Sequence, residues 1–384
     1  MREVVIVEGV RTPIGRRNGQ LSGIHAADLA AKPLAELIKR TGISPSLIDD
    51  VIMGCVTQSG EQAFDIGRMA ALIAGYPVEV PGTTIDRQCG SSQQAVHFAS
   101  QAILSGDMDI VVAAGIESMS RVPMFSNMQE AALSEELTSK YEMINQGISA
   151  DRIAKKYDIS KEEMDEFSLK SHEKAIAAQN KGYFEKEILP VDVTREDGSG
   201  HIITQDEGPR EDTSLERLAQ LKPAFQEDGK ITAGNASQIS DGAAAVLLMS
   251  REKAEELGLK PRFRVVARSV VGSDPTLMLL GPIPATEKVL KKADLTINDI
   301  DVFEVNEAFA SVPLAWLKET GADVTRLNPN GGAIALGHPL GASGTRLMVT
   351  MMHELERTGG RYGLQTMCEA HGMANATIIE RLDS

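Results

Sequence analysis

The chain has 384 residues, of which 42% are hydrophobic and 24% charged, and this balance excludes a disordered chain, a collagen-like repeat and a coiled-coil rod. Asp and Glu (54) outnumber Lys and Arg (39), and the net charge of −15 argues against broad nucleic-acid binding. No apolar run is long enough to span a membrane, and three cysteines are too few for a disulfide framework. We therefore expect a cytoplasmic protein with reduced cysteines and no membrane span.

Strand-like and helix-like segments alternate from the start of the chain. Buried-strand runs and segments with the 3.6-residue spacing of helices follow one another over residues 4–7, 26–40, 50–54, 91–105 and 109–115. The two helices end at Gly42 and Gly106, since glycine readily adopts the left-handed conformation of a C-cap. This alternation predicts an α/β protein with a mostly parallel sheet that is covered by helices on both faces.

The amino-acid composition changes in the middle of the chain. Residues 121–238 are richer in charge and in helix-forming residues, which predicts an inserted, mainly helical loop domain. Apolar strands resume at 242–249 and 262–267. We therefore expect an N-terminal half (1–120 with 239–260), the insert (121–238) and a C-terminal half (261–384).

Two pairs of segments suggest an internal repeat. SPSLIDDVIMG at 44–54 resembles LTINDIDVFEV at 295–305, each combining a short helical segment, an acidic pair and a buried strand. The strand at 110–114 has a similar counterpart at 364–368. The matches are short, so duplication and coincidence stay equally open.

Cys89 stands directly before the expected helix 91–105, in the segment DRQCGSS. A thiol at this place is close to unpaired backbone N–H groups and to the positive end of the helix dipole, which favour the thiolate. Gly90 lets a second chain segment approach closely. The segment supports a nucleophile and a buried structural cysteine equally.

His338 lies in the glycine-rich run 330–346, which leads into an expected helix that begins at Ser343. A histidine held between Gly337 and Pro339 is well placed as a general base. The alternative is a turn histidine whose ring nitrogens are simply hydrogen-bonded. The run lacks the spacing of a phosphate-binding loop, so we do not expect that function.

Cys368 and Asn306 both end expected strands. Strand ends in α/β sheets open onto the ligand crevice, so Cys368 is a candidate catalytic thiol. Cys368 and His371 also have a C-x-x-H spacing, but a zinc site needs further ligands, and we predict no metal. Asn306 is equally suited to an oxyanion or water site and to capping the helix that follows.

Taken together, these segments resemble the thiolases. The motifs, in the family's order, are DRQCGSS at 86–92, NEAFA at 306–310, GHPLGASGTR at 337–346 and the strand-end Cys368. A further match is TAGNASQISDGAAA at 232–245, and the resemblance extends from Glu3 to Arg381. It implies a duplicated five-layered α-β-α-β-α fold with an inserted helical loop domain. It also implies an acyltransferase (acetyl-CoA C-acyltransferase) that forms a homodimer or homotetramer, with coenzyme A as substrate and no permanently bound cofactor.

The resemblance also assigns roles by position in these motifs. Cys89 would be the acylated nucleophile and His338 the base that activates it. Cys368 would be a second acid/base, acting on the CoA thiol or on the acetyl methyl group. Asn306 would hold a water that forms one oxyanion hole with His338, and the backbone N–H groups of Cys89 and Ala370 would form the other.

Two further residues, Arg210 and Ser237, match family positions that contact CoA. An arginine suits a phosphate-bearing nucleotide, and a small serine suits a narrow pantetheine tunnel. Many thiolases have a glycine run after the second cysteine, where this chain has Glu369, Ala370 and His371. Ala370 can replace glycine only if its φ need not be positive, and His371 adds bulk and a titratable ring beside the acyl pocket.

The leading interpretation is a 3-ketoacyl-CoA thiolase of β-oxidation. Acetoacetyl-specific thiolases have a His-Met pair where this chain has Asn145 and Gln146, which favours the degradative branch. The alternatives are a biosynthetic acetoacetyl-CoA thiolase, a ketoacyl synthase that uses an acyl carrier protein, and a non-catalytic acyl-CoA-binding relative. Ketoacyl synthases lack the late cysteine, so Cys368 argues against that class.

Overall fold

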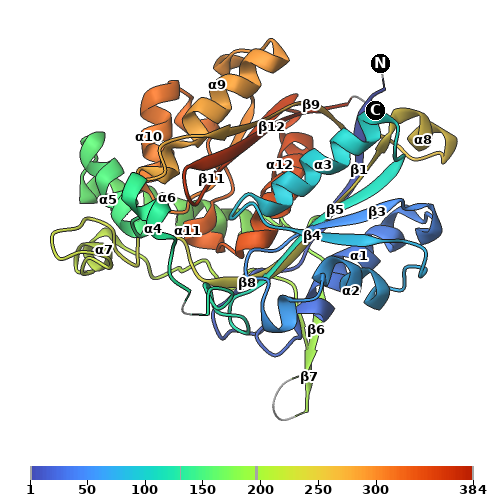
Figure 1. The fold of residues 1–384 in the computed structure, drawn as a ribbon, viewed down its shortest axis with the longest axis horizontal. Helices are drawn as coiled ribbons and strands as arrows, with labels where there is room; N and C mark the ends of the chain where they lie inside the picture. The colour runs from blue at the N-terminus through green and yellow to red at the C-terminus, as the bar shows by residue number, and fades with distance from the viewer. Residues whose placement is uncertain (1, 130, 195–197, 383–384) are drawn as a thin grey trace.

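The computed structural model describes residues 2–129, 131–194 and 198–382, and its main feature is a ten-stranded sheet. From the centre outward, the strand order is β1-β8-β5-β3-β4 on one side and β9-β12-β11-β10 on the other (Figure 1). The strands are β1 (Val4–Arg11), β3 (Asp50–Gly54), β4 (Gly82–Ile85), β5 (Ile110–Ser118), β8 (Ser240–Ser250), β9 (Phe263–Gly272), β10 (Val302–Val305), β11 (Tyr362–Glu369) and β12 (Met373–Arg381), with the short β2 (Gly15–Arg16) paired to β8.

The two sides of the sheet repeat one another. They meet at β1 and β9, which pair antiparallel through Val5 with Arg264 and Ile6 with Phe263. Counting outward from this pair, β3 corresponds to β10 and β5 corresponds to β11. These are the strands of the two segment pairs that resemble each other in sequence, so the repeat reflects a duplicated structure rather than coincidence.

The sheet is mixed, and the prediction of a mostly parallel sheet was wrong. Parallel pairing joins β3 to β4 and β5, and β10 to β11. In contrast, β8 is antiparallel to both β1 and β5, and β12 is antiparallel to both β9 and β11. All eleven residues of β8 are buried. A strand that is covered on both faces is continuously apolar, so its sequence does not reveal the direction of its neighbours.

Helices complete a five-layered α-β-α-β-α arrangement (Figure 1). In the central layer, α3 and α12 pack against each other and against strands from both halves of the sheet. The outer layers are α1 with α2 on one half and α9 with α10 on the other. Their bounds are α1 (Ala26–Thr41), α2 (Ile66–Ile73), α3 (Ser91–Ser105), α9 (Pro282–Ala293), α10 (Ser311–Thr320) and α12 (Ser343–Thr358), while α8 (Arg251–Glu256) packs on β1 and β8.

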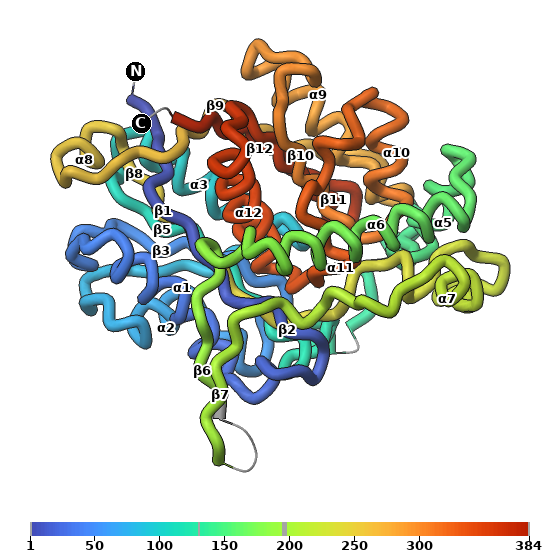
Figure 2. Tube along the Cα trace, turned by 180° about the vertical axis from the view of Figure 1, so that it is seen from behind, coloured from blue at the N-terminus to red at the C-terminus, as the bar shows by residue number. Residues whose placement is uncertain are grey.

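Between β5 and β8 the chain crosses the back of the molecule (Figure 2). The β6–β7 hairpin projects away from the body, whereas α5 and α6 pack on the C-terminal half. The helix α6 begins with a capping box in which Ser160 and Glu163 satisfy each other's backbone N–H groups. The elements are α4 (Glu135–Lys140), α5 (Gln146–Lys156), α6 (Lys161–Asn180), β6 (Val191–Thr194), β7 (Gly200–Ile203) and α7 (Leu215–Ala219), and the short α11 (Ala333–Leu336) packs on α6.

A buried arginine connects the segment between β5 and β8 to the sheet. Arg11, at the end of β1, is fully buried and donates hydrogen bonds to Glu187 (2.7 Å) and to both carboxylate oxygens of Asp206 (2.7 and 2.9 Å). We expect Arg11→Met to lower the free energy of unfolding by about 3–5 kcal/mol, because it leaves two buried carboxylates without their cation. Urea unfolding measures this loss.

The matched control for Arg11 is Lys140→Met, which breaks the exposed pair between Lys140 and Glu136 and should cost less than about 1 kcal/mol. Equal losses for the two variants would show that the buried pair does not anchor the segment between β5 and β8.

Within the described residues, no helix is long and apolar enough to cross a membrane.

Candidate active site

Cys89 lies in the turn that directly precedes α3, in the interior of the molecule. Its side chain is buried, and Gly90 is the N-cap of the helix. The preceding residue, Gln88, has φ 49°, in the left-handed region that non-glycine residues rarely adopt. Strained backbone of this kind is found at sites where a side chain must be presented in one direction, and here it presents the Cys89 thiol.

The environment of Cys89 favours the protonated thiol over the thiolate. Burial raises its pKa well above the ordinary value, and the nearby Cys368 and Glu369 raise it further. The expectation that the start of α3 would favour a thiolate is therefore not met, because loss of hydration outweighs the helix dipole. A reaction at Cys89 thus requires a base that removes its proton.

His338 is held as a neutral base. Its Nδ1 lies 2.6 Å from Ser343 Oγ, whose hydroxyl donates to the Pro339 carbonyl at 2.8 Å. Ser343 therefore accepts from Nδ1–H, which leaves a lone pair on Nε2. Asn306 Nδ2 donates to this Nε2 at 3.3 Å. The contact brings together two of the residues selected from the sequence, one after β10 and one before α12.

The charge state of His338 follows from its surroundings. Burial lowers its pKa to about 3, and the buried cation of Arg346 acts in the same direction. His338 is consequently unprotonated at neutral pH and can accept a proton. Asn306 is buried as well, and its Oδ1 has no hydrogen-bond partner among the described residues.

Direct bonds join the segments that carry Cys89 and His338. The N–H of Thr345, in the first turn of α12, donates to Ser92 Oγ in the first turn of α3 at 2.9 Å. The two helices approach this closely because Gly344 has no side chain, since a Cβ there would overlap the backbone of Gln93. The starts of α3 and α12 are therefore fixed relative to each other.

A buried carboxylate, Glu117 near the end of β5, connects two further segments of the site to each other. It accepts hydrogen bonds from the N–H groups of Val56 (3.0 Å), Thr57 (3.0 Å) and Gly341 (2.8 Å). Sequence analysis missed Glu117 and Ser343. The available signals were a charged residue that ends an apolar strand, and a hydroxyl five residues after His338 within the same motif.

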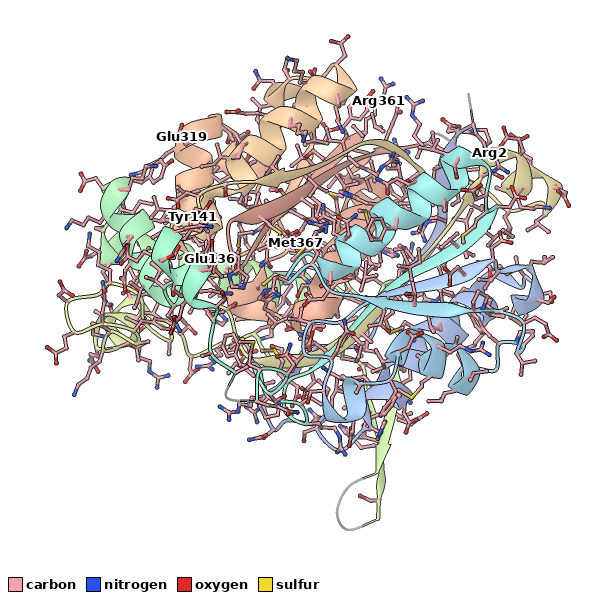
Figure 3. All side chains as sticks on the ribbon, in the orientation of Figure 1. Arg2, Glu136, Tyr141, Glu319, Arg361 and Met367 are labelled. Carbon is pink, nitrogen blue, oxygen red and sulfur yellow. The ribbon has the colours of Figure 1, made fainter. Side chains whose placement is uncertain are left out.

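Cys368 occupies the next-to-last position of β11, directly after Met367, which Figure 3 labels near the middle of the view. Burial raises the pKa of its thiol to about 12. Cys368 in turn raises the pKa of the Cys89 thiol. Ala370 is absent from the described residues with positive φ, so it replaces a glycine without strain, whereas His371 has φ 63°.

An apolar cavity of about 250 Å³ opens beside Cys89. The polar residues that line it are Thr57, Gln88, Asn127, Gln146 and His371. The apolar members that line it are Val56, Met124, Phe125, Met128, Leu133 and Leu340. The cavity is therefore suited to hold an aliphatic group next to the thiol.

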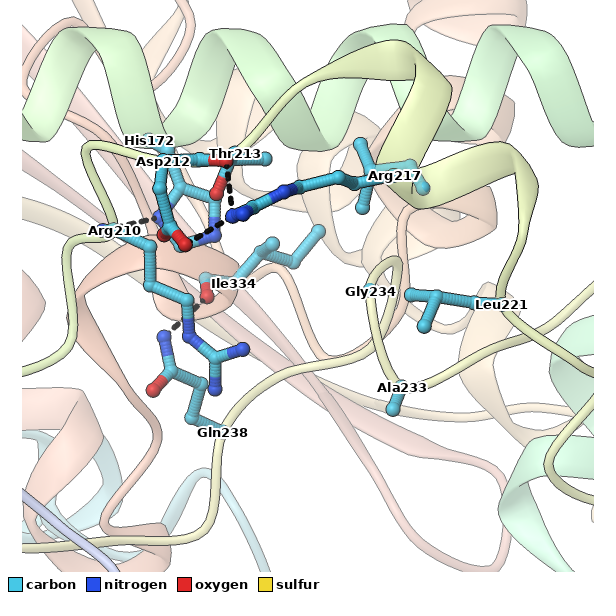
Figure 4. Close-up of a pocket in the computed structure, with 11 residues that line it drawn as sticks. His172, Arg210, Asp212, Thr213, Arg217, Leu221, Ala233, Gly234, Gln238 and Ile334 are labelled. Atoms are coloured by element: carbon cyan, nitrogen blue, oxygen red, sulfur yellow. Dashed lines mark hydrogen bonds and ion pairs between the residues drawn. The ribbon is translucent and has the colours of Figure 1, made fainter.

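A second cavity, of about 190 Å³, contains Arg210 (Figure 4). The exposed guanidinium of Arg210 points toward Gln238, and its backbone N–H donates to His172 at 3.1 Å. The carbonyl of Gln238 accepts from the N–H of His338 at 3.1 Å, so Gln238 connects this cavity to the base. Ser237 is half-buried beside Gln238, and its N–H donates to the Ala308 carbonyl at 2.9 Å.

The site thus combines a buried thiol, a neutral histidine with an asparagine at its free nitrogen, a second thiol and an apolar cavity. This combination is suited to acyl transfer through a cysteine. Arg210 lies apart from these groups, in the second cavity. Among the described residues, no three His, Cys, Asp or Glu side chains are grouped so that they could hold a metal ion.

Comparison with known proteins gives the family. The model of the thiolase N-terminal domain matches residues 4–252, and that of the thiolase C-terminal domain matches residues 259–381. The chain belongs to the thiolase family, and it is an acyltransferase. Its fold is the thiolase fold, as the acetyl-CoA acetyltransferase of Bacillus anthracis also shows, with a TM-score of 0.92, 41% identity and 100% and 99% of the two chains covered.

Two relatives are similar over all or nearly all of their length. A steroid 3-ketoacyl-CoA thiolase of Mycobacterium tuberculosis is 52% identical, covering 100% of this chain and 95% of the relative. A 3-oxoadipyl-CoA/3-oxo-5,6-dehydrosuberyl-CoA thiolase of Escherichia coli is 46% identical, with both chains covered completely.

Proposed function

We propose that the protein is a degradative 3-ketoacyl-CoA thiolase that works through an acyl group on Cys89. It cleaves a 3-ketoacyl-CoA with CoA into acetyl-CoA and an acyl-CoA shortened by two carbons. The observation that carries this proposal is the apolar cavity with Cys89 in its wall, because the acyl chain must lie next to the thiol that receives it. The related thiolases support the same chemistry.

In the first half-reaction, Nε2 of His338 takes the proton of Cys89, and the sulfur attacks the 3-keto carbon of the substrate. The bond between carbons 2 and 3 then breaks, and its electron pair takes a proton from Cys368 to give the methyl group of acetyl-CoA. In the second half-reaction, Cys368 takes the proton of the CoA thiol, CoA attacks the thioester on Cys89, and His338 returns its proton to Cys89.

Two oxyanion holes are part of the proposal. A water held by Asn306, together with His338, would stabilise one oxyanion, and the unpartnered Oδ1 of Asn306 supports this role because it offers an acceptor to such a water. The backbone N–H groups of Cys89 and Ala370 would stabilise the other. Ala370 is not among the described residues with positive φ. Its N–H can therefore serve as this donor without a glycine at the position.

Arg210 and Ser237 are proposed to bind coenzyme A. The exposed cation of Arg210 in the second cavity favours a nucleotide phosphate there. Ser237 lies between that cavity and the segment that follows Asn306, where its small side chain leaves room for pantetheine. Coenzyme A acts in this scheme as a substrate, and no permanently bound cofactor takes part.

The cavity predicts a preference for aliphatic 3-ketoacyl groups longer than acetoacetyl. Each buried methylene contributes about 0.8 kcal/mol, so kcat/KM should rise about three- to fourfold per carbon until the cavity is full. The described residues that line it include no lysine or arginine, so 3-oxoadipyl-CoA should be a poorer substrate than its aliphatic counterpart of similar length. Thiolysis assays with purified substrates measure both preferences.

Acetoacetyl-CoA as the preferred substrate would instead support the biosynthetic alternative. Tight binding of acyl-CoA without turnover would support a non-catalytic relative. Turnover restricted to acyl groups on a carrier protein would support a ketoacyl synthase.

We also propose that the enzyme is cytoplasmic and forms a homodimer or homotetramer. Its three cysteines are all unpaired, which suits a reducing compartment. Exposed apolar side chains next to the sheet-edge strand β4, namely Phe64, Ile73 and Val78, suit an interface between subunits.

A further inference from the structure

A buried carboxyl group that the scheme above does not use lies against Gly90, in the turn that carries Cys89. Glu369 follows Cys368 at the end of β11, and its side chain is completely buried. Both of its carboxyl oxygens are without a hydrogen-bond partner in the described part of the chain. A buried carboxylate without partners is so costly that the un-ionised acid is the expected form.

The contact of Glu369 with the Cys89 turn is tight. A Cβ on Gly90 would overlap Oε1 of Glu369 and would lie 2.8 Å from Nδ2 of Asn375. The same Nδ2 donates to the carbonyl of Gly90 at 3.0 Å, whereas Oδ1 of Asn375 has no partner among the described residues. Glu369 and Asn375 thus lie side by side under the peptide that follows Cys89.

We propose that Glu369 is a positioning residue that acts as an un-ionised acid under the Cys89–Gly90 peptide, and that its ionisation suppresses the reactivity of Cys89. In the un-ionised form its hydroxyl can donate to Asn375 Oδ1, and Asn375 in turn donates to Gly90, which steadies the turn. In the ionised form this donor is lost, and a negative charge opposes formation of the Cys89 thiolate.

The charges around Glu369 set the pH at which this change occurs. Burial raises its pKa to about 8, Arg87 opposes this rise, and Asp86 adds to it. Both belong to the turn before Cys89. Ionised Glu369 also raises the pKa of Cys89 and of Cys368. The charge on Glu369, and with it the suppression, is absent below its pKa and present above it. As the pH rises through about 8, the rate of Cys89 should therefore fall about tenfold behind that of a thiol whose pKa stays constant.

The test measures the rate at which iodoacetamide alkylates Cys89 as a function of pH, read by mass spectrometry of the Cys89 peptide. In Glu369→Gln the rate should match the wild type near about pH 6.5 and exceed it about tenfold near about pH 9.5, because one neighbouring charge shifts a thiol pKa by about one unit. The matched control is Glu304→Gln. Glu304 is equally buried, and its pKa is also raised to about 8, but it is not among the groups that act on Cys89.

Coincident profiles for the wild type and Glu369→Gln, or an equal shift in Glu304→Gln, would overturn the proposal. If Glu369→Gln does not fold, the wild-type profile alone is decisive. Across the pKa of Glu369, its rate must fall about tenfold behind the steady tenfold rise per pH unit of a thiol with a constant pKa. The absence of this lag also overturns the proposal. The inference rests on the proposed role of Cys89, but alkylation needs no turnover. A failure of the thiolase assay is thereby distinguished from a failure of this inference.

Discussion

Replacement of Cys89 by alanine is expected to remove the acyl-enzyme and to lower kcat by roughly 10⁴-fold or more, the scale seen when a covalent catalyst loses its nucleophile. The thiol lies in the wall of the acyl cavity, and no other cysteine lines that cavity among the described residues. Intact-protein mass spectrometry after incubation with acetyl-CoA should show a gain of one acetyl group in the wild type and none in Cys89→Ala.

Cys55→Ala is the matched control for this experiment. Cys55 is also buried and unpaired, and burial raises the pKa of its thiol as well. Cys55 directly follows β3 and has no place in the proposed reaction, so Cys55→Ala should still gain the acetyl group. Acetylation that survives in Cys89→Ala, or that disappears only in Cys55→Ala, would contradict Cys89 as the nucleophile.

Much of the fold could be predicted from the chain because its strands and helices carry strong local signals. The helix α3 has the predicted bounds, since Gly90 and Gly106 mark its two ends, and Gly106 adopts φ 87°. The strands β3 and β5 are apolar runs that can only be buried. Strand direction was not predictable, because β8 is buried on both faces and shows no alternation.

The site shows the same division between local signals and distant contacts. Cys89 and Cys368 stand out because each lies at the end of a recognisable element, and His338 stands out because it lies in the glycine-rich run before α12. The contact of Asn306 with His338 joins residues 32 apart, and no local pattern encodes it. Glu369 is a clearer example of a feature that the local sequence does not encode. A glutamate in a sequence is normally read as a solvent-facing residue, and its complete burial arises only when β11 is placed under the Cys89 turn.

The same reasoning explains why the cavity walls were missed. Met124, Phe125 and Met128 are at least 35 positions from Cys89, and they have no spacing that marks a pocket. They line the cavity because the chain after β5 folds back over the start of α3. Substrate preference is therefore set by tertiary contacts, and the chemistry by the motifs.

Replacement of His338 by alanine is expected to slow acylation of Cys89 by about 10³–10⁴-fold, because the buried thiol then has no base to take its proton. The pH dependence should change in form. Burial lowers the pKa of His338 to about 3, so wild-type acylation should be nearly constant between about pH 5 and 7.5. In His338→Ala the rate should instead rise about tenfold per pH unit, because only spontaneously ionised Cys89 reacts.

Ser343→Ala provides the graded comparison that connects this effect to the tautomer of His338. It removes the acceptor of Nδ1–H, so Nε2 is no longer fixed as the acceptor, and we expect a loss of about 10–100-fold. Rapid-quench measurement of acetylation by acetyl-CoA, with intact mass as the readout, separates these steps from product release. A pH-independent rate in His338→Ala would show that another group removes the proton from Cys89, and the hydrogen-bond chain from Pro339 through Ser343 to His338 would then have only a structural role.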